Sequence, residues 1–174
     1  MLEILVFPDP RLRKVAIPVV SFDEKLGTLI DEMLETMYGA NGIGLAATQV
    51  NQHICLLVLD VSEDRDQPKT YINLEIIERQ GEQECEEGCL SVPGIYANVK
   101  RALNIRIRAQ DRDGRVFEGD AEDLHAVCLQ HELDHLEGRL FVDYLSPLKQ
   151  RMVRKKLEKS RKQALQEEPT GSLI

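Results

Sequence analysis

The pentapeptide His-Glu-Leu-Asp-His at residues 131–135 lies in a segment whose periodicity decides how the middle of the chain folds. Apolar residues, followed by the two histidines, recur every three or four positions, which is the spacing of one helix face. The members of this stripe are Leu124, Val127, Cys128, His131 and His135. We therefore predict a helix with Asp120 as its N-cap, Asp123 in its first turn and Gly138 at its end.

On such a helix the two histidines project from one face and can bind the same divalent cation. Glu132 is displaced around the helix and can act on water at the metal instead of coordinating it. The alternative interpretation is a surface helix with two solvated histidines. The apolar stripe favours an interior position, where a shared metal is one of the few arrangements that satisfies two buried imidazoles together.

A third ligand is needed, because a catalytic tetrahedral site uses three protein ligands and leaves one position open. Metzincin proteases place a third histidine six residues after the second, where this chain has Phe141. Gluzincin proteases use a later glutamate, and this chain offers only Glu158, Glu167 and Glu168, all in a highly charged segment. The pattern therefore argues against these proteases and predicts a ligand upstream.

The four cysteines form no Cys-x-x-Cys pair. Cys55 lies in an apolar run and Cys128 on the apolar helix stripe, so both are interpreted as small buried hydrophobes. Cys85 lies in an acidic stretch and is predicted to point outward. Cys89 follows Gly88, which permits close backbone approach, and its thiolate is a better candidate for a metal ligand than for a structural or redox role.

Three motifs together resemble the peptide deformylases. They are Gly-Ile-Gly-Leu-Ala-Ala-Thr-Gln at 42–49, Glu-Gly-Cys-Leu-Ser at 87–91 and the pentapeptide at 131–135, in the order of that family. The surrounding sequence, from residues 7–10 to the closing helix, fits the same pattern. The resemblance implies a metal-dependent hydrolase that removes the N-formyl group from the N-terminal methionine of new bacterial polypeptides and releases formate.

The resemblance also implies residue roles. Glu132 would accept a proton from the attacking water and deliver one to the departing amine. The Gln49 amide and the Leu90 backbone N–H would stabilise the oxyanion. The implied metal ligands are Cys89, His131 and His135, with water in the fourth position. Ferrous iron is the metal commonly used by the family in the cell, although the ligand types also suit zinc, nickel or cobalt.

Further residues are assigned to the substrate and to the support of the ligands. The backbone of Ile43 and Gly44 can pair with an extended substrate, although the glycines of this segment could also form a simple turn. Glu87 is predicted to pair with Arg101 and hold the Cys89 loop. The predicted apolar pocket for the methionine side chain comprises Ile43, Leu124, Val127 and Cys128, which could also be ordinary core. Together with Gly44 and Gly88, these are the residues predicted to bind substrate.

The order of the predicted elements favours an α+β fold with one domain over residues 1–166. Mixed or antiparallel sheets would surround the metal-binding helix, a C-terminal helix would cover about 147–166, and 167–174 would be a flexible tail. The other predicted elements are a helix at Ser21–Tyr38, strands at Ile54–Asp60, Thr70–Ile77, Asn98–Gln110 and Arg115–Glu118, and a polar loop at Ser62–Gln67.

Charge is unevenly distributed around a formal net value of −8. Residues 149–163 carry eight basic residues and one acidic residue. This segment is either a solvated helix face or an electrostatic contact with the ribosome, as the resemblance suggests. We expect a cytoplasmic monomer without a membrane span. A metal-dependent peptidase and a non-catalytic ribosome-associated module are the alternatives, and the presence of both Glu132 and Gln49 favours an enzyme.

Overall fold

The computed structural model describes residues 1–167. The predicted flexible tail lies outside the described residues except for Glu167, the last residue of the C-terminal helix α3 (Pro147–Glu167). Among the described residues, no helix combines the length and the apolar character that crossing a bilayer requires.

The strands form two antiparallel sheets, which confirms the predicted α+β class. The larger sheet has the order β1-β2-β3-β6-β7, and β4 and β5 form a separate hairpin. The strands are β1 (Gly44–Ala46), β2 (Leu56–Leu59), β3 (Lys69–Gln80), β4 (Gln83–Cys89), β5 (Val92–Arg101), β6 (Asn104–Gln110) and β7 (Val116–Glu122). The remaining helices are α1 (Glu24–Gly39), α2 (Asp123–Leu136) and the short 3-10 helices at Pro10–Arg13, Ala47–Val50 and Phe141–Tyr144.

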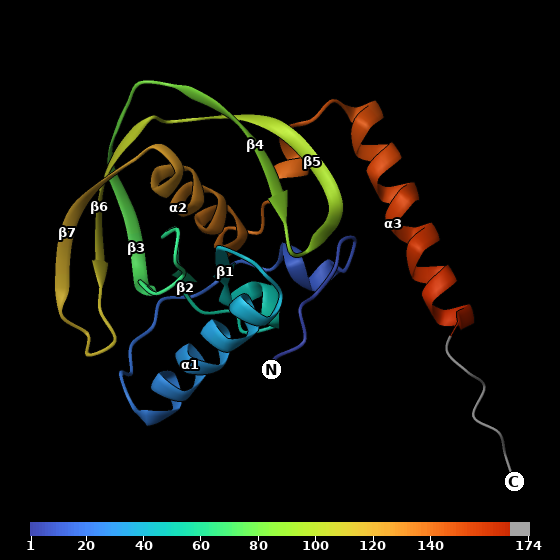
Figure 1. Cartoon of the computed structure of the whole chain (residues 1–174). Coiled ribbons are helices and arrows are strands. Elements are labelled where there is room, and N and C mark those ends of the chain that lie inside the picture. Colours follow the sequence, from blue (N-terminus) through green and yellow to red (C-terminus); the bar gives the residue numbers. More distant parts are fainter. Residues whose placement is uncertain (168–174) are drawn as a thin grey trace, which may run out of the picture.

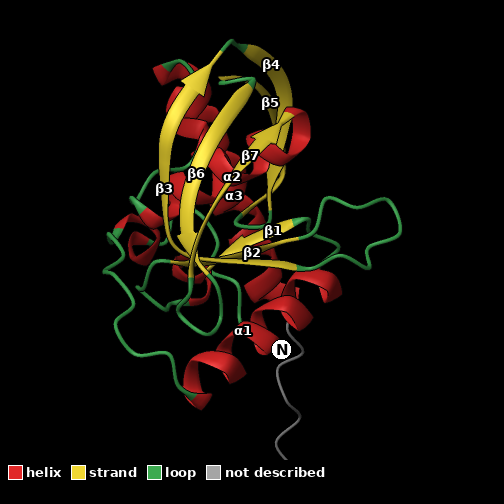
Figure 2. Ribbon diagram, turned by 90° about the vertical axis from the view of Figure 1, so that its left-hand side faces the viewer, coloured by secondary structure: helices red, strands yellow, loops and turns green. Residues whose placement is uncertain are grey.

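Helix α2 lies at the centre of the molecule, between the large sheet and the β4–β5 hairpin, while α1 covers the far side of β1 and β2 (Figure 1). Figure 2 shows β3, β6 and β7 side by side, with β1 and β2 at the other end of the same sheet. Strand β2 separates two cores because alternate side chains point to opposite faces. Leu57 and Leu59 pack with α2, and Leu56 and Val58 pack with α1.

Helix α2 ends as predicted but begins later. Gly138 has a φ of 78° just beyond the last turn, and its N–H donates to the carbonyl of His135, so the glycine ends the helix. The predicted cap at Asp120 is wrong, because the chain remains in β7 through Glu122. Glu122 is the N-cap and Asp123 is the first helical residue.

The predicted strand over Asn98–Gln110 is two strands, β5 and β6, separated at residues 102–103. Residues 98–101 of β5 pair with β4. Strand β4 covers the acidic stretch, which the sequence did not identify as a strand. The two strands of this hairpin position both Cys89 and Arg101. The predicted return strand is longer than expected and begins at Val116.

Candidate metal centre and active site

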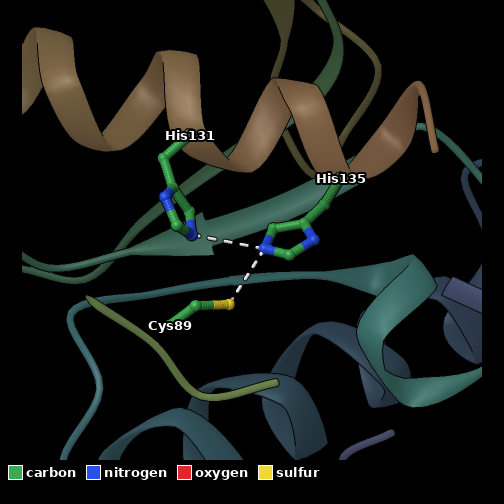
Figure 3. A group of neighbouring side chains, drawn as sticks. All are labelled: Cys89, His131 and His135. Atoms are coloured by element: carbon green, nitrogen blue, oxygen red, sulfur yellow. Dashed lines mark hydrogen bonds between the residues drawn. The ribbon is translucent and has the colours of Figure 1, made fainter. Parts of the chain in front are cut away.

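Three metal-ligating side chains converge from two separate elements (Figure 3). His131 and His135 project from the same face of α2, and Cys89 comes from the end of β4. The Nε2 atom of His135 lies 3.2 Å from Sγ of Cys89 and 3.2 Å from Nε2 of His131. The three ligand atoms lie within 4.8 Å of one another, so one ion can contact all of them.

The hydrogen bonds of this cluster fit a metal. The Nδ1 atom of His131 lies 2.8 Å from Oε1 of Glu87, an ionised carboxylate that can only accept. This contact assigns a proton to Nδ1, so Nε2, which lies toward Cys89 and His135, is the atom through which His131 could bind a metal. Two nitrogens and one sulfur are a donor set suited to a divalent transition metal.

The electrostatics of the cluster favour a positive ion. Burial opposes protonation of His131, but its contacts with Cys89 and Glu87 and the charge of Glu132 raise its pKa well above the ordinary value. Its surroundings therefore carry negative potential, which attracts a cation. Burial and the charge of His131 hold the pKa of His135 well below its ordinary value, so this residue is a neutral imidazole, the form that binds metals.

Glu132 lies beside the two histidines and is 5% exposed. Its Oε2 atom has no hydrogen-bond partner in the described part of the chain, and the residue lines the same pocket as Cys89 and His131. Burial raises the pKa of Glu132 to about 7, against the opposing effect of His131. A carboxyl group with a pKa near neutrality is suited to both accepting and donating a proton.

Strand β1 packs directly against this carboxylate through Gly44. A Cβ atom added to Gly44 would lie 2.6 Å from Oε1 of Glu132. The glycine is therefore required by close approach, which adds a role beyond the predicted backbone contact with substrate.

Gln49 is held with its amide nitrogen toward Cys89 and Ser91. Its Oε1 accepts from the backbone N–H of Ala46 at 2.9 Å, so the NH₂ group faces the other way. This nitrogen donates to Oγ of Ser91 at 3.0 Å and lies 3.6 Å from Sγ of Cys89. Leu90 lies between these two residues and lines the same pocket. Gln49 and Leu90, the residues of the predicted oxyanion donors, both line the pocket that Cys89, His131 and Glu132 line.

All six residues predicted for substrate binding line a single cavity of about 480 Å³. Its walls come from the segment before β1, the β4–β5 hairpin and the face of α2. The residues from the predicted set are Ile43, Gly44, Gly88, Leu124, Val127 and Cys128. Because β1 is the terminal strand of its sheet, one of its edges pairs with no other strand in the described part of the chain, and an extended peptide could add there.

The predicted Glu87–Arg101 pair is present and buried. Arg101 donates to Glu87 through Nε at 2.8 Å and Nη2 at 2.9 Å, so the contact is bidentate. Glu87 is therefore held between Arg101 and His131. Burial of Glu87 is outweighed by these hydrogen bonds, which lower its pKa and keep it ionised.

Other lining residues were missed. Cys85 was predicted to point outward, but it lines the cavity. In β4 it lies two residues from Glu87 and therefore on the same face. Recognising residues 83–89 as a strand would have revealed this placement. Tyr96 also lines the cavity, and its ring packs so closely on Gly88 that an added Cβ would lie 2.6 Å from it.

Comparisons with known proteins give one family. A sequence model described as "Polypeptide deformylase" matches residues 1–151. A peptide deformylase of Hahella chejuensis is 59% identical over 162 residues, which cover 92% of this chain and 96% of the relative. The crystal structure of a peptide deformylase from Legionella pneumophila has a TM-score of 0.91 and 50% identity, covering 97% of this chain and 99% of that one. A peptide deformylase from Ehrlichia chaffeensis, solved in complex with actinonin, has a TM-score of 0.88 and 36% identity over 92% of this chain and 97% of that one.

Proposed function

The chain belongs to the peptide deformylase family, and we propose that Glu132 and the cluster of Cys89, His131 and His135 carry out its reaction. Enzymes of this family are metal-dependent hydrolases that remove the N-formyl group from the methionine of new polypeptides. The observation that carries the proposal is the convergence of one thiol and two imidazoles, with Cys89, His131 and the buried carboxylate of Glu132 lining one cavity.

Cys89, His131 and His135 would hold the metal as its three ligands. A divalent cation bound there supplies Lewis acidity, which makes water a better nucleophile near neutral pH and favours negative charge on the formyl oxygen. Glu87 fixes the tautomer and orientation of His131 from behind, and Arg101 holds Glu87.

Glu132 moves the proton. Its unpartnered Oε2 accepts a proton from the water that attacks the formyl carbon. The same carboxyl group then donates a proton to the amine nitrogen as the carbon–nitrogen bond breaks. The products are formate and a free N-terminal amine. The raised pKa of about 7 suits both steps, because neither protonation state is strongly favoured near neutral pH.

The Gln49 side chain and the Leu90 backbone N–H donate to the oxygen that becomes negative during attack. The bond from Ala46 to Gln49 keeps the amide in the donating orientation before substrate binds. A donor that is already oriented costs no reorganisation during the reaction, which is why such donors are effective.

The methionine side chain occupies the cavity between β4 and α2. Leu124, Val127 and Cys128 give it an apolar wall, and Cys85 adds a second sulfur to this wall. The peptide backbone extends along the edge of β1 at Ile43 and Gly44. Formyl specificity comes from the close space around the carbonyl carbon, which accepts a hydrogen but not an acetyl methyl group.

Ferrous iron is the metal proposed in the cell, while zinc, nickel and cobalt also suit the ligands. The site is built within one chain, so a monomer is sufficient for activity, and the cytoplasm is the compartment where new polypeptides are available.

Helix α3 is proposed as a contact with the ribosome. Val153 and Leu157 are buried against the body of the protein, while the basic residues of 149–163 are exposed. Replacing Lys155, Lys159 and Lys162 by glutamate is expected to weaken ribosome binding most at low salt, because phosphate contacts are lost. Unchanged affinity would rule out this contact.

The central test is formate release from a formyl-methionyl peptide. The metal-loaded chain should release formate without cleaving internal peptide bonds. Glu132→Gln should reduce the rate by about 10²–10⁴-fold, the usual contribution of a general acid–base, and should keep its metal. Release of formate by Glu132→Gln at the wild-type rate would show that Glu132 has no such role, and cleavage of internal bonds would favour a peptidase.

A further inference from the structure

The support of His131 extends beyond Glu87 and Arg101. Arg101 also donates from Nη1 to Oδ2 of Asp134 at 2.7 Å. The same Oδ2 accepts from the hydroxyl of Tyr144 at 2.8 Å. A continuous series of hydrogen bonds therefore runs from Tyr144, at the end of the 3-10 helix that follows α2, to the ring of His131.

The charges along this series of hydrogen bonds explain why Asp134 needs the hydrogen bond that Tyr144 donates. Arg101 is one cation shared between two carboxylates, Glu87 and Asp134, with side chains 5%, 4% and 11% exposed. Arg139 approaches only the other oxygen of Asp134, Oδ1, at 4.0 Å, so Oδ2 is left to Arg101 and Tyr144. A buried carboxylate must be compensated by hydrogen bonds or opposite charge. The Tyr144 hydroxyl supplies a neutral donor to Asp134, and Arg101 can therefore keep two of its donors on Glu87.

The ring of Tyr144 reinforces this arrangement. The guanidinium of Arg101 lies 5.0 Å from the ring centroid, which limits movement of the guanidinium away from Glu87. The three residues Arg101, Asp134 and Tyr144 line a polar cavity of about 390 Å³, distinct from the substrate cavity.

We infer that Tyr144 is a positioning residue for the metal ligand His131, acting through Asp134, Arg101 and Glu87. The inference rests on the proposed role of His131 as a ligand. Loss of the hydroxyl lets Asp134 draw Arg101 toward itself. Arg101 then holds Glu87 less firmly, and Glu87 is the carboxylate that accepts from the His131 ring and orients it. The consequence is faster loss of metal.

The size of the effect follows from the distance to the metal. Removing a direct partner of a ligating histidine typically costs about 10–100-fold in metal affinity. Tyr144 is three contacts further out, and water in the adjoining cavity can partly replace its hydroxyl. We expect metal release to be about 3- to 10-fold faster, below the range for a direct partner.

The experiment measures zinc release from the full chain into excess chelator, comparing wild type with Tyr144→Phe. Tyr38→Phe is the matched control. The Tyr38 hydroxyl donates to Asp60 at 2.6 Å, and the guanidinium of Arg65 lies 5.3 Å from the centroid of the Tyr38 ring. A tyrosine, an aspartate and an arginine therefore also meet here, away from the proposed metal ligands. Tyr38→Phe should release zinc at the wild-type rate even if it lowers thermal stability as much as Tyr144→Phe.

Asp134→Asn is the second variant and should also release zinc faster than wild type. Because the hydroxyl acts through this carboxylate, adding Tyr144→Phe to Asp134→Asn should produce little further increase. The inference is overturned if either single variant releases zinc at the wild-type rate, or if their effects multiply in the double variant.

A wrong assignment of the metal ligands would give different results in this experiment. If wild type does not hold zinc in one-to-one ratio, or if Cys89→Ala holds it equally tightly, the ligand assignment is wrong. If wild type holds zinc and only the Tyr144 comparison fails, the ligand assignment stands and the positioning role does not.

Discussion

Replacing Gly44 by alanine is expected to damage catalysis while leaving the metal in place. An added Cβ would lie 2.6 Å from Oε1 of Glu132 and 3.1 Å from its Cδ and Cγ. The backbone N–H and carbonyl of residue 44, which are proposed to pair with substrate, are retained in alanine. The substitution therefore acts mainly on the position of the proposed general base.

The magnitude follows from the distance. Ordinary van der Waals contact begins at 3.4 Å, so the carboxylate must retreat by about 0.8 Å. A misplacement of about 1 Å can cost about 100-fold in rate, equivalent to about 2.7 kcal/mol. We expect kcat to fall about 100-fold and KM to change by less than about threefold, since the metal ligands and the apolar wall are unchanged.

Steady-state formate release, together with metal analysis, measures this effect. Gly119→Ala is the control, because Gly119 lies in β7 and no heavy atom lies within 4 Å of an added Cβ. The control should have the wild-type kcat. A Gly44→Ala enzyme with kcat within threefold of wild type would refute the reasoning, and so would one that loses activity only because it loses metal.

Three further outcomes are expected. Gly27→Ala should raise the free energy of unfolding in urea by about 0.5–1 kcal/mol, because Gly27 lies in α1 with open space around an added Cβ; no gain would contradict this. Burial raises the pKa of Asp60, but hydrogen bonds from Ser62 and Tyr38 outweigh it and lower the pKa to about 2. The stability that this carboxylate contributes is therefore complete above its unfolded pKa of about 4 and is lost as the pH falls toward 2. Urea unfolding of Asp60→Asn should lack this loss of stability. If the variant and the wild type lose stability identically between about pH 4 and 2, the contribution of Asp60 is excluded. An acetyl-methionyl peptide should have a kcat/KM about 10- to 200-fold below its formyl counterpart, as one methyl group allows, and equal values would reject the close fit at the carbonyl carbon.

The helix that carries the pentapeptide was predictable because its apolar stripe has one period and leads directly into the two histidines. Its end was also predictable, since Gly138 supplies the positive φ that a helix terminus favours. Its start was not, because Asp120 is a plausible cap in isolation. The pairing of β7 with β6 extends the strand to Glu122 and overrides that local preference.

The β4–β5 hairpin was the main element that sequence did not reveal. Residues 83–89 combine acidic side chains with two cysteines, whereas strands are usually recognised from β-branched and aromatic residues. Without this strand, the inward direction of Cys85 could not be deduced. The same limit applied to Asp134 and Tyr144, to which the sequence assigned no role, because the hydrogen bond between them depends on tertiary packing.

The prediction for Cys89 came from a combination of residue chemistry and resemblance. The glycine before it and the chemistry of its thiolate favour a ligand over a structural or redox role, and the resemblance carried by the three motifs implies the ligand role. The structure adds that Sγ lies 3.2 Å from His135, although the two residues are 46 positions apart. Such convergence depends on the packing of the hairpin against α2 and cannot be read from spacing.

X-ray absorption spectroscopy of the zinc-loaded protein tests the central claim most directly, because it counts the atoms that bind the ion. Cys89, His131 and His135 predict one sulfur at about 2.3 Å and two imidazole nitrogens at about 2.0–2.1 Å. The sulfur contribution should disappear in Cys89→Ala. A spectrum without sulfur in the wild-type protein, or with sulfur that persists in the variant, would contradict the account.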